Sequence, residues 1–185
     1  MNSYSFRGEK VMKKNKFNKN KIVLVILFIL VLGLTGCNST SPTKVAKGQA
    51  TAIIEYVITK DNEGLKSLFT PESSLSSTLE QEIEDFLNFI DGNIISYDKI
   101  YGGRDNAKLR YGKAVYEKLY GKVSNIKTDT GKNYEIRHYA ISVDEEKTDE
   151  IGVYCIIIVD LDTYDSDIGY PDYGKRIIGQ FRKSE

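Results

Sequence analysis

The chain has 185 residues, with 26 basic and 26 acidic side chains, one histidine, two cysteines and no tryptophan. Seven of the basic and one of the acidic side chains lie in residues 1–36, so residues 37–185 hold 19 basic and 25 acidic ones, a net charge of −6. An acidic domain argues against nucleic acid as a partner. Two cysteines are too few for a zinc site, and we expect neither a metal nor a cofactor.

The first 34 residues carry the pattern of a secretory signal. Five lysines and no acid lie between Met12 and Lys21, and an apolar run of 13 residues extends from Ile22 to Leu34. At about 1.5 Å per residue the run makes roughly 20 Å of helix, which is shorter than the ~30 Å hydrocarbon core of a bilayer. The pattern therefore favours a signal peptide over a membrane span. Met1 and Met12 are both candidate start residues, and Met12 opens the lysine-rich segment directly.

A cysteine follows the apolar run in the sequence Leu34-Thr35-Gly36-Cys37. These residues resemble the bacterial lipobox, in which the cysteine thiol takes a diacylglyceryl group and becomes the first residue after cleavage. The resemblance implies a signal peptide over residues 1–36, a lipidated Cys37 with a short tether over 37–43, and a single domain over 44–185. The membrane is then a partner through the lipid, and the domain lies on the extracytoplasmic face of the cell membrane. The acidic charge of the domain argues against a polybasic contact with anionic lipid, so the lipid must hold it.

The first half of the domain predicts three helices. Apolar residues share one helical face from Lys44 onward, and a short second helix follows the turn at 61–64 and ends at Pro71. Ser77 as N-cap and Glu80 three residues later fit a capping box for the third helix, which Asp91-Gly92 ends. The apolar stripe of this third helix consists of Leu79, Ile83, Phe86, Leu87 and Ile90.

The second half predicts strands. Residues 93–103 are strand-like. Residues 111–127 fit a strand or a short helix, and we favour a strand because Gly112 and Gly121 weaken a helix. Residues 128–132 give a hairpin turn signal. A phase slip in the apolar pattern near Arg137-His138 predicts a β-bulge that bends the next strand. Residues 151–161 are apolar on both faces and predict a central strand, and 175–181 can close the sheet. The fold class is α+β, with three N-terminal helices packed on a curved antiparallel sheet.

Three segments carry a resemblance to known families. "VITKDNEGLKSLF" resembles the helix-turn-helix opening of the nuclear transport factor 2-like, or SnoaL-like, superfamily. "FLNFIDGNIISYD" and "YAISVDEEKTDEIGVYCIIIVD" resemble an uncharacterised family of Gram-positive lipoproteins, domain of unknown function 5104. The resemblance covers roughly residues 45–165 and implies a cone-shaped fold. It implies no activity, because the superfamily includes enzymes, binding modules and assembly domains.

Single residues give few signs of chemistry. Cys155 lies in a β-branched run, where a free cysteine usually behaves as a small buried hydrophobe. His138 is the only histidine, and without a carboxylate at a suitable spacing we expect a structural or surface role. The run after residue 159 lacks the glycine and glutamate of a calcium loop, which favours a solvated acidic loop. Its acidic residues are Asp160, Asp162, Asp165 and Asp167.

Tyrosine is the best indication of ligand binding, since its ring and hydroxyl suit the wall of a pocket. The candidate pocket-lining residues are Tyr97, Tyr134, Tyr139 and Tyr154, although core packing is the better explanation for most tyrosines in the strands. Two functions therefore stay open. We favour a non-catalytic module that binds a small molecule or a protein. The alternative is a small cone-fold enzyme of the isomerase or dehydratase type, with His138 or an Asp as base and a Tyr as hydrogen-bond donor.

Overall fold

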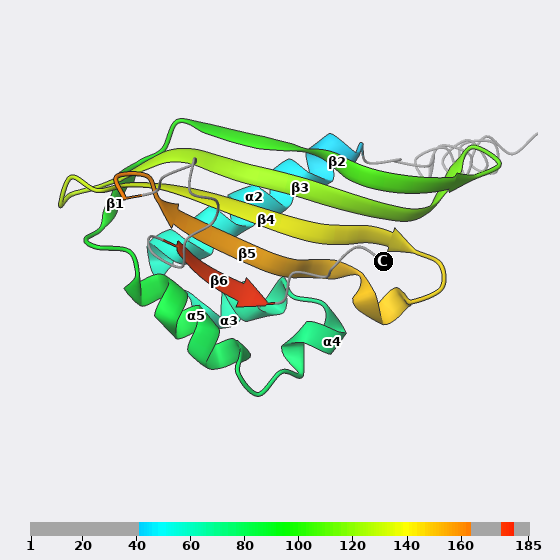
Figure 1. Cartoon of the computed structure of the whole chain (residues 1–185), viewed down its shortest axis with the longest axis horizontal. Helices are drawn as coiled ribbons and strands as arrows, with labels where there is room; N and C mark the ends of the chain where they lie inside the picture. Colours follow the sequence, from blue (N-terminus) through cyan, green and yellow to red (C-terminus); the bar gives the residue numbers. More distant parts are fainter. Residues whose placement is uncertain (1–40, 164–174, 180–185) are drawn as a thin grey trace, which may run out of the picture. The chain divides into compact units, whose positions relative to one another are not determined.

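A computed structural model describes residues 41–163 and 175–179 of the chain. The predicted signal peptide, Cys37, Asp165 and Asp167 lie outside these residues. Within them the chain folds as α+β, with helices followed by a curved, unclosed antiparallel sheet, as Figure 1 shows. The predicted fold class is therefore confirmed at this level.

Four helices precede the sheet in the described residues. They are α2 (Pro42–Thr59), α3 (Asn62–Ser67), α4 (Pro71–Ser74) and α5 (Leu79–Asn88). Ser41 caps α2, and Pro42 takes the first helical position, where its missing N–H costs no hydrogen bond. α2 thus begins two residues before the predicted domain start. Pro71 opens α4 instead of only ending the helix before it, because Thr70 provides a cap for a new turn.

The start of α5 differs from the predicted capping box. Its N-cap is Thr78, whose hydroxyl donates to the Glu82 carboxylate at 2.8 Å. The predicted partner Glu80 instead makes an ion pair with Lys66 on α3. The hydroxyls of Ser76 and Thr78 form a tight turn before the helix, so the helix starts one residue later than the motif indicates. The predicted stripe of α5 is otherwise correct, since Leu79, Ile83, Phe86 and Leu87 are buried.

The sheet of the described residues consists of six antiparallel strands. Five of them lie in the order β1-β3-β4-β5-β6, and β2 also pairs with β3. Their bounds are β1 Ile94–Ser96, β2 Lys99–Arg110, β3 Lys113–Thr128, β4 Asn133–Asp144, β5 Gly152–Asp160 and β6 Lys175–Gly179. A short 3-10 helix, Thr148–Glu150, lies between β4 and β5. The strand prediction for 111–127 and the predicted hairpin turn are both confirmed.

The main core lies between the helices and one face of the sheet. α2 and α5 supply most of its helical side, and β5 supplies Val153, Ile156 and Ile158. On the opposite face β5 supplies Cys155, Ile157 and Val159 to a second buried cluster. β5 therefore lies between β4 and β6 and is buried on both faces, as its apolar sequence predicts.

The predicted bulge near Arg137-His138 is wrong in place. The pairing of β4 with both neighbouring strands is unbroken at these two residues. The extra residues lie elsewhere, at Ser142 in β4, at Tyr154 in β5 and between Val123 and Ile126 in β3. Both faces of the sheet are buried here, so β4 carries apolar residues on both faces. The prediction wrongly interpreted this pattern as a phase slip.

Candidate functional site

The structure brings two of the four candidate tyrosines together. Tyr139 and Tyr154 lie on the face of the sheet away from the helices, with ring centroids 6.4 Å apart. Tyr134 lies in the main core on the other face. Tyr97 lies in the short link between β1 and β2 and is 39% exposed. The four residues therefore do not line one pocket.

Tyr134 fastens the end of α5 to β4. Its hydroxyl accepts a hydrogen bond from the backbone N–H of Asp91 at 3.0 Å and donates to the carbonyl of Phe89 at 3.5 Å. Its ring meets the Phe89 ring edge-on, with centroids 6.0 Å apart. Burial raises the pKa of the Tyr134 hydroxyl. These contacts explain the residue as a structural element of the core.

The tyrosines on the opposite face pack on one another and on lysines. Tyr120 and Tyr139 have ring centroids 5.4 Å apart. The Lys118 ammonium lies 5.9 Å from the ring centroids of both Tyr116 and Tyr154. Burial raises the pKa of the Tyr154 hydroxyl, so this group stays protonated at neutral pH. The arrangement is an aromatic and cationic surface layer over the second cluster.

His138 lies beneath α2 and is 1% exposed. Its Nε2 is 3.3 Å from Oε1 of Gln49 on α2. Burial lowers the pKa of the ring to about 4, so the imidazole is neutral at pH 7. A Cβ at Gly121 would stand 2.1 Å from Cε1 of this ring, so only glycine fits opposite it. The buried position agrees with the structural role expected from the sequence.

The acidic run after β5 forms a turn as far as it is described. The Asp160 carboxylate accepts from the Asp162 backbone N–H at 2.9 Å and lies 3.7 Å from Nζ of Lys132. The Asp162 carboxylate accepts from the Asn133 N–H at 3.3 Å. No group of three or more His, Cys, Asp or Glu side chains in the described residues is arranged to hold a metal ion.

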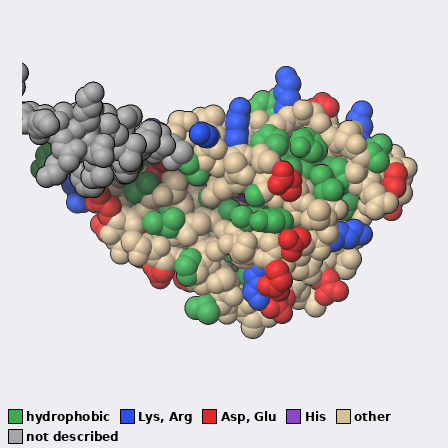
Figure 2. Space-filling model, turned by 180° about the vertical axis from the view of Figure 1, so that it is seen from behind, with side chains coloured by type: hydrophobic (Ala, Val, Ile, Leu, Met, Phe, Trp, Pro, Cys, Tyr) green, Lys and Arg blue, Asp and Glu red, His purple; other side chains and the backbone are tan. Residues whose placement is uncertain are grey.

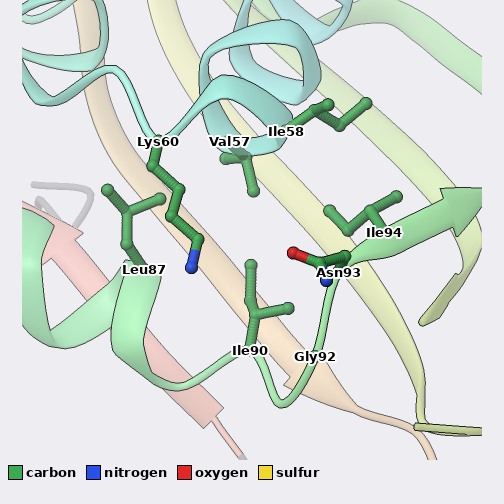
Figure 3. Close-up of a pocket in the computed structure, with 8 residues that line it drawn as sticks. All are labelled: Val57, Ile58, Lys60, Leu87, Ile90, Gly92, Asn93 and Ile94. Atoms are coloured by element: carbon green, nitrogen blue, oxygen red, sulfur yellow. The ribbon is translucent and has the colours of Figure 1, made fainter. Parts of the chain in front are cut away.

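A groove at one end of the helical layer is the candidate binding site (Figure 3). It lies between the end of α2, the end of α5 and the start of β1, and its open volume is about 260 Å³ including adjoining solvent. Most of this volume is open solvent, and the part that a water-sized molecule can occupy is about 20 Å³, room for about one water, so the feature is a shallow surface groove that holds at most the tip of one side chain. The lining residues are Val57, Ile58, Lys60, Leu87, Ile90, Gly92, Asn93 and Ile94.

The backbone at the end of α2 places a cation over this groove. Lys60 adopts a left-handed conformation, with φ of 52°, and its N–H closes the last turn of the helix. The chain therefore turns away, and the Lys60 side chain extends between Leu87 and Ile90 (Figure 3). Within the described residues no carboxylate lies within ion-pair distance of its ammonium.

The opposite wall is fixed by the turn into β1. Gly92 has φ of 85°, and a Cβ there would stand 2.3 Å from the Asp129 carboxylate. The N–H and Nδ2 of Asn93 both donate to that carboxylate, at 2.8 and 2.9 Å. These hydrogen bonds hold the pKa of Asp129 below its usual value. These hydrogen bonds hold the wall in place, and the Asn93 side-chain oxygen points toward the groove (Figure 3).

An apolar rim extends from the groove to the surface. Ile58, in the last turn of α2, is 47% exposed. Figure 2, which views the helical side, shows hydrophobic side chains gathered toward the end of the domain away from the β2–β3 hairpin. Isoleucine exposed at the mouth of an apolar groove is typical of a contact surface. The sequence did not predict this site, because two separate segments form it, the end of α2 and the connection from α5 to β1.

The fold and this groove define an α+β domain with a shallow groove of aliphatic and polar groups at one end of its helical layer. The model of the family called Domain of unknown function (DUF5104) matches residues 52–161. The chain belongs to that family. A comparison with curated proteins found no match. Within the described residues, no helix is both long and apolar enough to cross a bilayer.

Proposed function

We propose that this protein is a lipoprotein of a Gram-positive cell, held on the extracytoplasmic face of the membrane by a lipid on Cys37, and that its domain binds another protein. The segment Leu34-Thr35-Gly36-Cys37 at the end of a short apolar run supports the attachment. The order of helices followed by an open curved sheet supports membership of the nuclear transport factor 2-like superfamily.

The groove carries the proposal of binding. Its walls are aliphatic, and its one charged side chain, Lys60, has no carboxylate partner in the described part of the chain. A protein segment with an apolar side chain beside a carboxylate fits this combination, since the apolar group would fill the groove and the carboxylate would pair with Lys60. No carboxylate or histidine lines the groove, so the lining supports binding over proton transfer.

Site-specific crosslinking in the native membrane tests the binding. A photoreactive residue at Ile58 should give one crosslinked product of defined mass. The same residue at Leu75, which is 85% exposed and lies at the end of α4, is the matched control and should not. Lys60→Glu should reduce the product at position 58, whereas Lys44→Glu, at the other end of α2, should not. Equal products at positions 58 and 75 would refute the groove as the binding site.

Incorporation of labelled lipid tests the attachment separately. Cys37→Ala should abolish incorporation and leave an uncleaved or released protein. Normal incorporation in this variant would refute the lipid anchor without affecting the groove.

A further inference from the structure

The turn between β2 and β3 combines unfavourable backbone geometry with full exposure. Tyr111 and Gly112 form a two-residue turn in which both have positive φ, 50° and 78°. Such turns favour asparagine or glycine, because a residue with a Cβ is disfavoured in the left-handed region. Tyr111 is nevertheless present and is 100% exposed, so its ring gains no packing within the domain. A tyrosine in this position is better explained by a contact outside the domain.

The side chains around the turn share one chemical character. Leu109 is 61% exposed, and Lys108, Arg110 and Lys113 are exposed as well. An amphipathic aromatic ring and a leucine among cations match the composition that proteins place at the interface between lipid headgroups and acyl chains. We call the segment Lys108–Lys113 the hairpin tip.

The hairpin tip lies at the end of the domain where the chain enters. The first turns of α2 cross β2 at Gly102, where a Cβ would stand 2.7 Å from the backbone nitrogen of Lys47. The other end of α2 shares the groove with Ile94, at the start of β1. α2 therefore runs antiparallel to β1 and β2, and its N-terminus faces the hairpin tip. Figure 1 shows the β2–β3 hairpin extending past the helices in this direction.

Chain lengths put the hairpin tip within reach of the membrane. From Gly102 to Arg110 is eight strand residues, about 26 Å, whereas Ser41 lies only about 8 Å of helix beyond Ala46. The tip thus extends roughly 20 Å farther than Ser41 in the same direction. Cys37 is four residues before Ser41, which allows at most about 14 Å of extended chain. With a lipid on Cys37, an orientation in which the hairpin tip points toward the bilayer therefore brings the tip to the bilayer surface.

We propose that the hairpin tip contacts a phospholipid bilayer with anionic headgroups, as a second contact beside the lipid anchor. This inference rests on the proposed attachment through Cys37. Tyr111 and Leu109 enter the interface between headgroups and acyl chains, and Lys108 and Lys113 face the phosphates, since Arg110 is paired with Glu145. These two local cations act against the net acidic charge of the domain, so the contact adds to the lipid anchor and does not replace it. The contact would fix the orientation of the domain and turn the groove, at the other end of α2, away from the membrane.

Acidic side chains limit the depth of this contact. The loop after β4 lies beside the hairpin, because the Glu145 N–H bonds the carbonyl of Val115. Glu145 lies 3.9 Å from Arg110 in an exposed ion pair, and Glu146 and Asp149 are exposed in the same loop. The Glu145 carboxylate reaches Arg110 within the hairpin tip, so it stays at the level of the headgroups and limits how deeply the tip enters the lipid.

Tryptophan fluorescence tests the contact, since the chain has no tryptophan of its own. Tyr111→Trp is placed in the full-length lipidated protein, in vesicles of phosphatidylglycerol and phosphatidylcholine whose acyl chains carry bromine. Tyr97→Trp, in the link at the other end of β2, is the matched control. We expect bromine to quench at least about half of the emission at position 111 and to leave position 97 unchanged.

Two results would overturn the inference, and they separate it from the attachment. Equal quenching by bromine at positions 111 and 97, in a protein that has incorporated labelled lipid, refutes the hairpin contact and leaves the lipid anchor supported. A protein that incorporates no lipid and shows no quenching at position 111 refutes both. Quenching at position 111 without lipid incorporation supports the hairpin contact and refutes the anchor.

Discussion

On the face of the sheet that α2 and α5 cover, β4 and β5 present aliphatic side chains together with the buried Tyr134 and His138. On the opposite face the same two strands present apolar residues from β5 beside tyrosines and a paired glutamate, and β3 adds lysines. There Glu135 on β4 accepts from Arg137 at 2.6 Å and lies 3.1 Å from Nζ of Lys122. Helices that pack directly on a sheet require closely fitting apolar surfaces, whereas long amphipathic side chains cover the other face with their polar ends in water. The helical face should therefore be far more sensitive to substitution.

The largest expected effect is at the centre of the helical face. Ile156→Asp puts a carboxylate at a fully buried position, which should cost several kcal/mol of a typical stability of about 5–15 kcal/mol. We expect no folded protein, or a much lower midpoint in urea unfolding. Ile58→Asp, on the exposed rim of the groove, is the control and should shift the midpoint little. Similar midpoints for the two variants would contradict the central position of β5.

The buried histidine should make the helical face sensitive to acid. In the folded protein the pKa of His138 is about 4, whereas in the unfolded chain it is near 6.5. The unfolded chain therefore binds a proton first, and stability falls as the pH drops from about 6.5 toward 4. By pH 4.5 the loss should reach about 2–3 kcal/mol.

His138→Gln should remove this part of the acid sensitivity, because glutamine does not titrate. The acid sensitivity is measured as the change in the urea unfolding midpoint between pH 7 and pH 4.5. Comparing this change in wild type and variant separates the contribution of His138 from that of the carboxylates, which both proteins share. An identical pH dependence in the two proteins would show that His138 is not a buried neutral ring.

A smaller effect should follow from one methyl group opposite that ring. Gly121→Ala places a Cβ 2.1 Å from the His138 ring and 3.0 Å from the Ala46 carbonyl oxygen, so the ring must move. We expect the free energy of unfolding to fall by about 1–3 kcal/mol. Gly103→Ala is the matched control, because a Cβ there meets nothing within 4 Å. The double variant Gly121→Ala/His138→Ala should lose less free energy of unfolding than the two single variants lose together. Additive losses would mean that the two residues do not press on each other.

The smallest effect should come from the opposite face. Lys118→Gln removes a cation from above the rings of Tyr116 and Tyr154 and should cost no more than about 1 kcal/mol. Thermal unfolding of the variant against wild type measures this. A loss as large as that from Gly121→Ala would show that both faces are packed equally closely.

The elements predicted correctly are those with a strong local period. The stripe of α5 and the apolar run of β5 are readable because burial on one or both faces selects residues at fixed intervals. β2 is longer than the sequence indicates, since Gly102 and Gly103 resemble a strand end. Gly102 is there because Lys47 of α2 passes over it, a contact between segments distant in the chain.

The candidate site was less predictable than the fold. Tyrosines in strands share one sequence signature, whether they pack in a core like Tyr134 or on a surface like Tyr139. The groove depends on Lys60 ending α2 and on Asn93 binding Asp129, 36 residues away. Neither the helix end nor these hydrogen bonds repeat along the sequence, so no periodic pattern predicts the groove.

The connectivity of β3 has a consequence for how the chain folds. This strand pairs with β1 and β2, which precede it, and with β4, which follows it, and turns of a few residues join it to β2 and β4. Contacts between sequence neighbours close small loops and form quickly. We therefore expect the β2–β3–β4 meander to form early. The docking of α2 and β6, at the two extremes of the domain, should come later and set the rate of the final step.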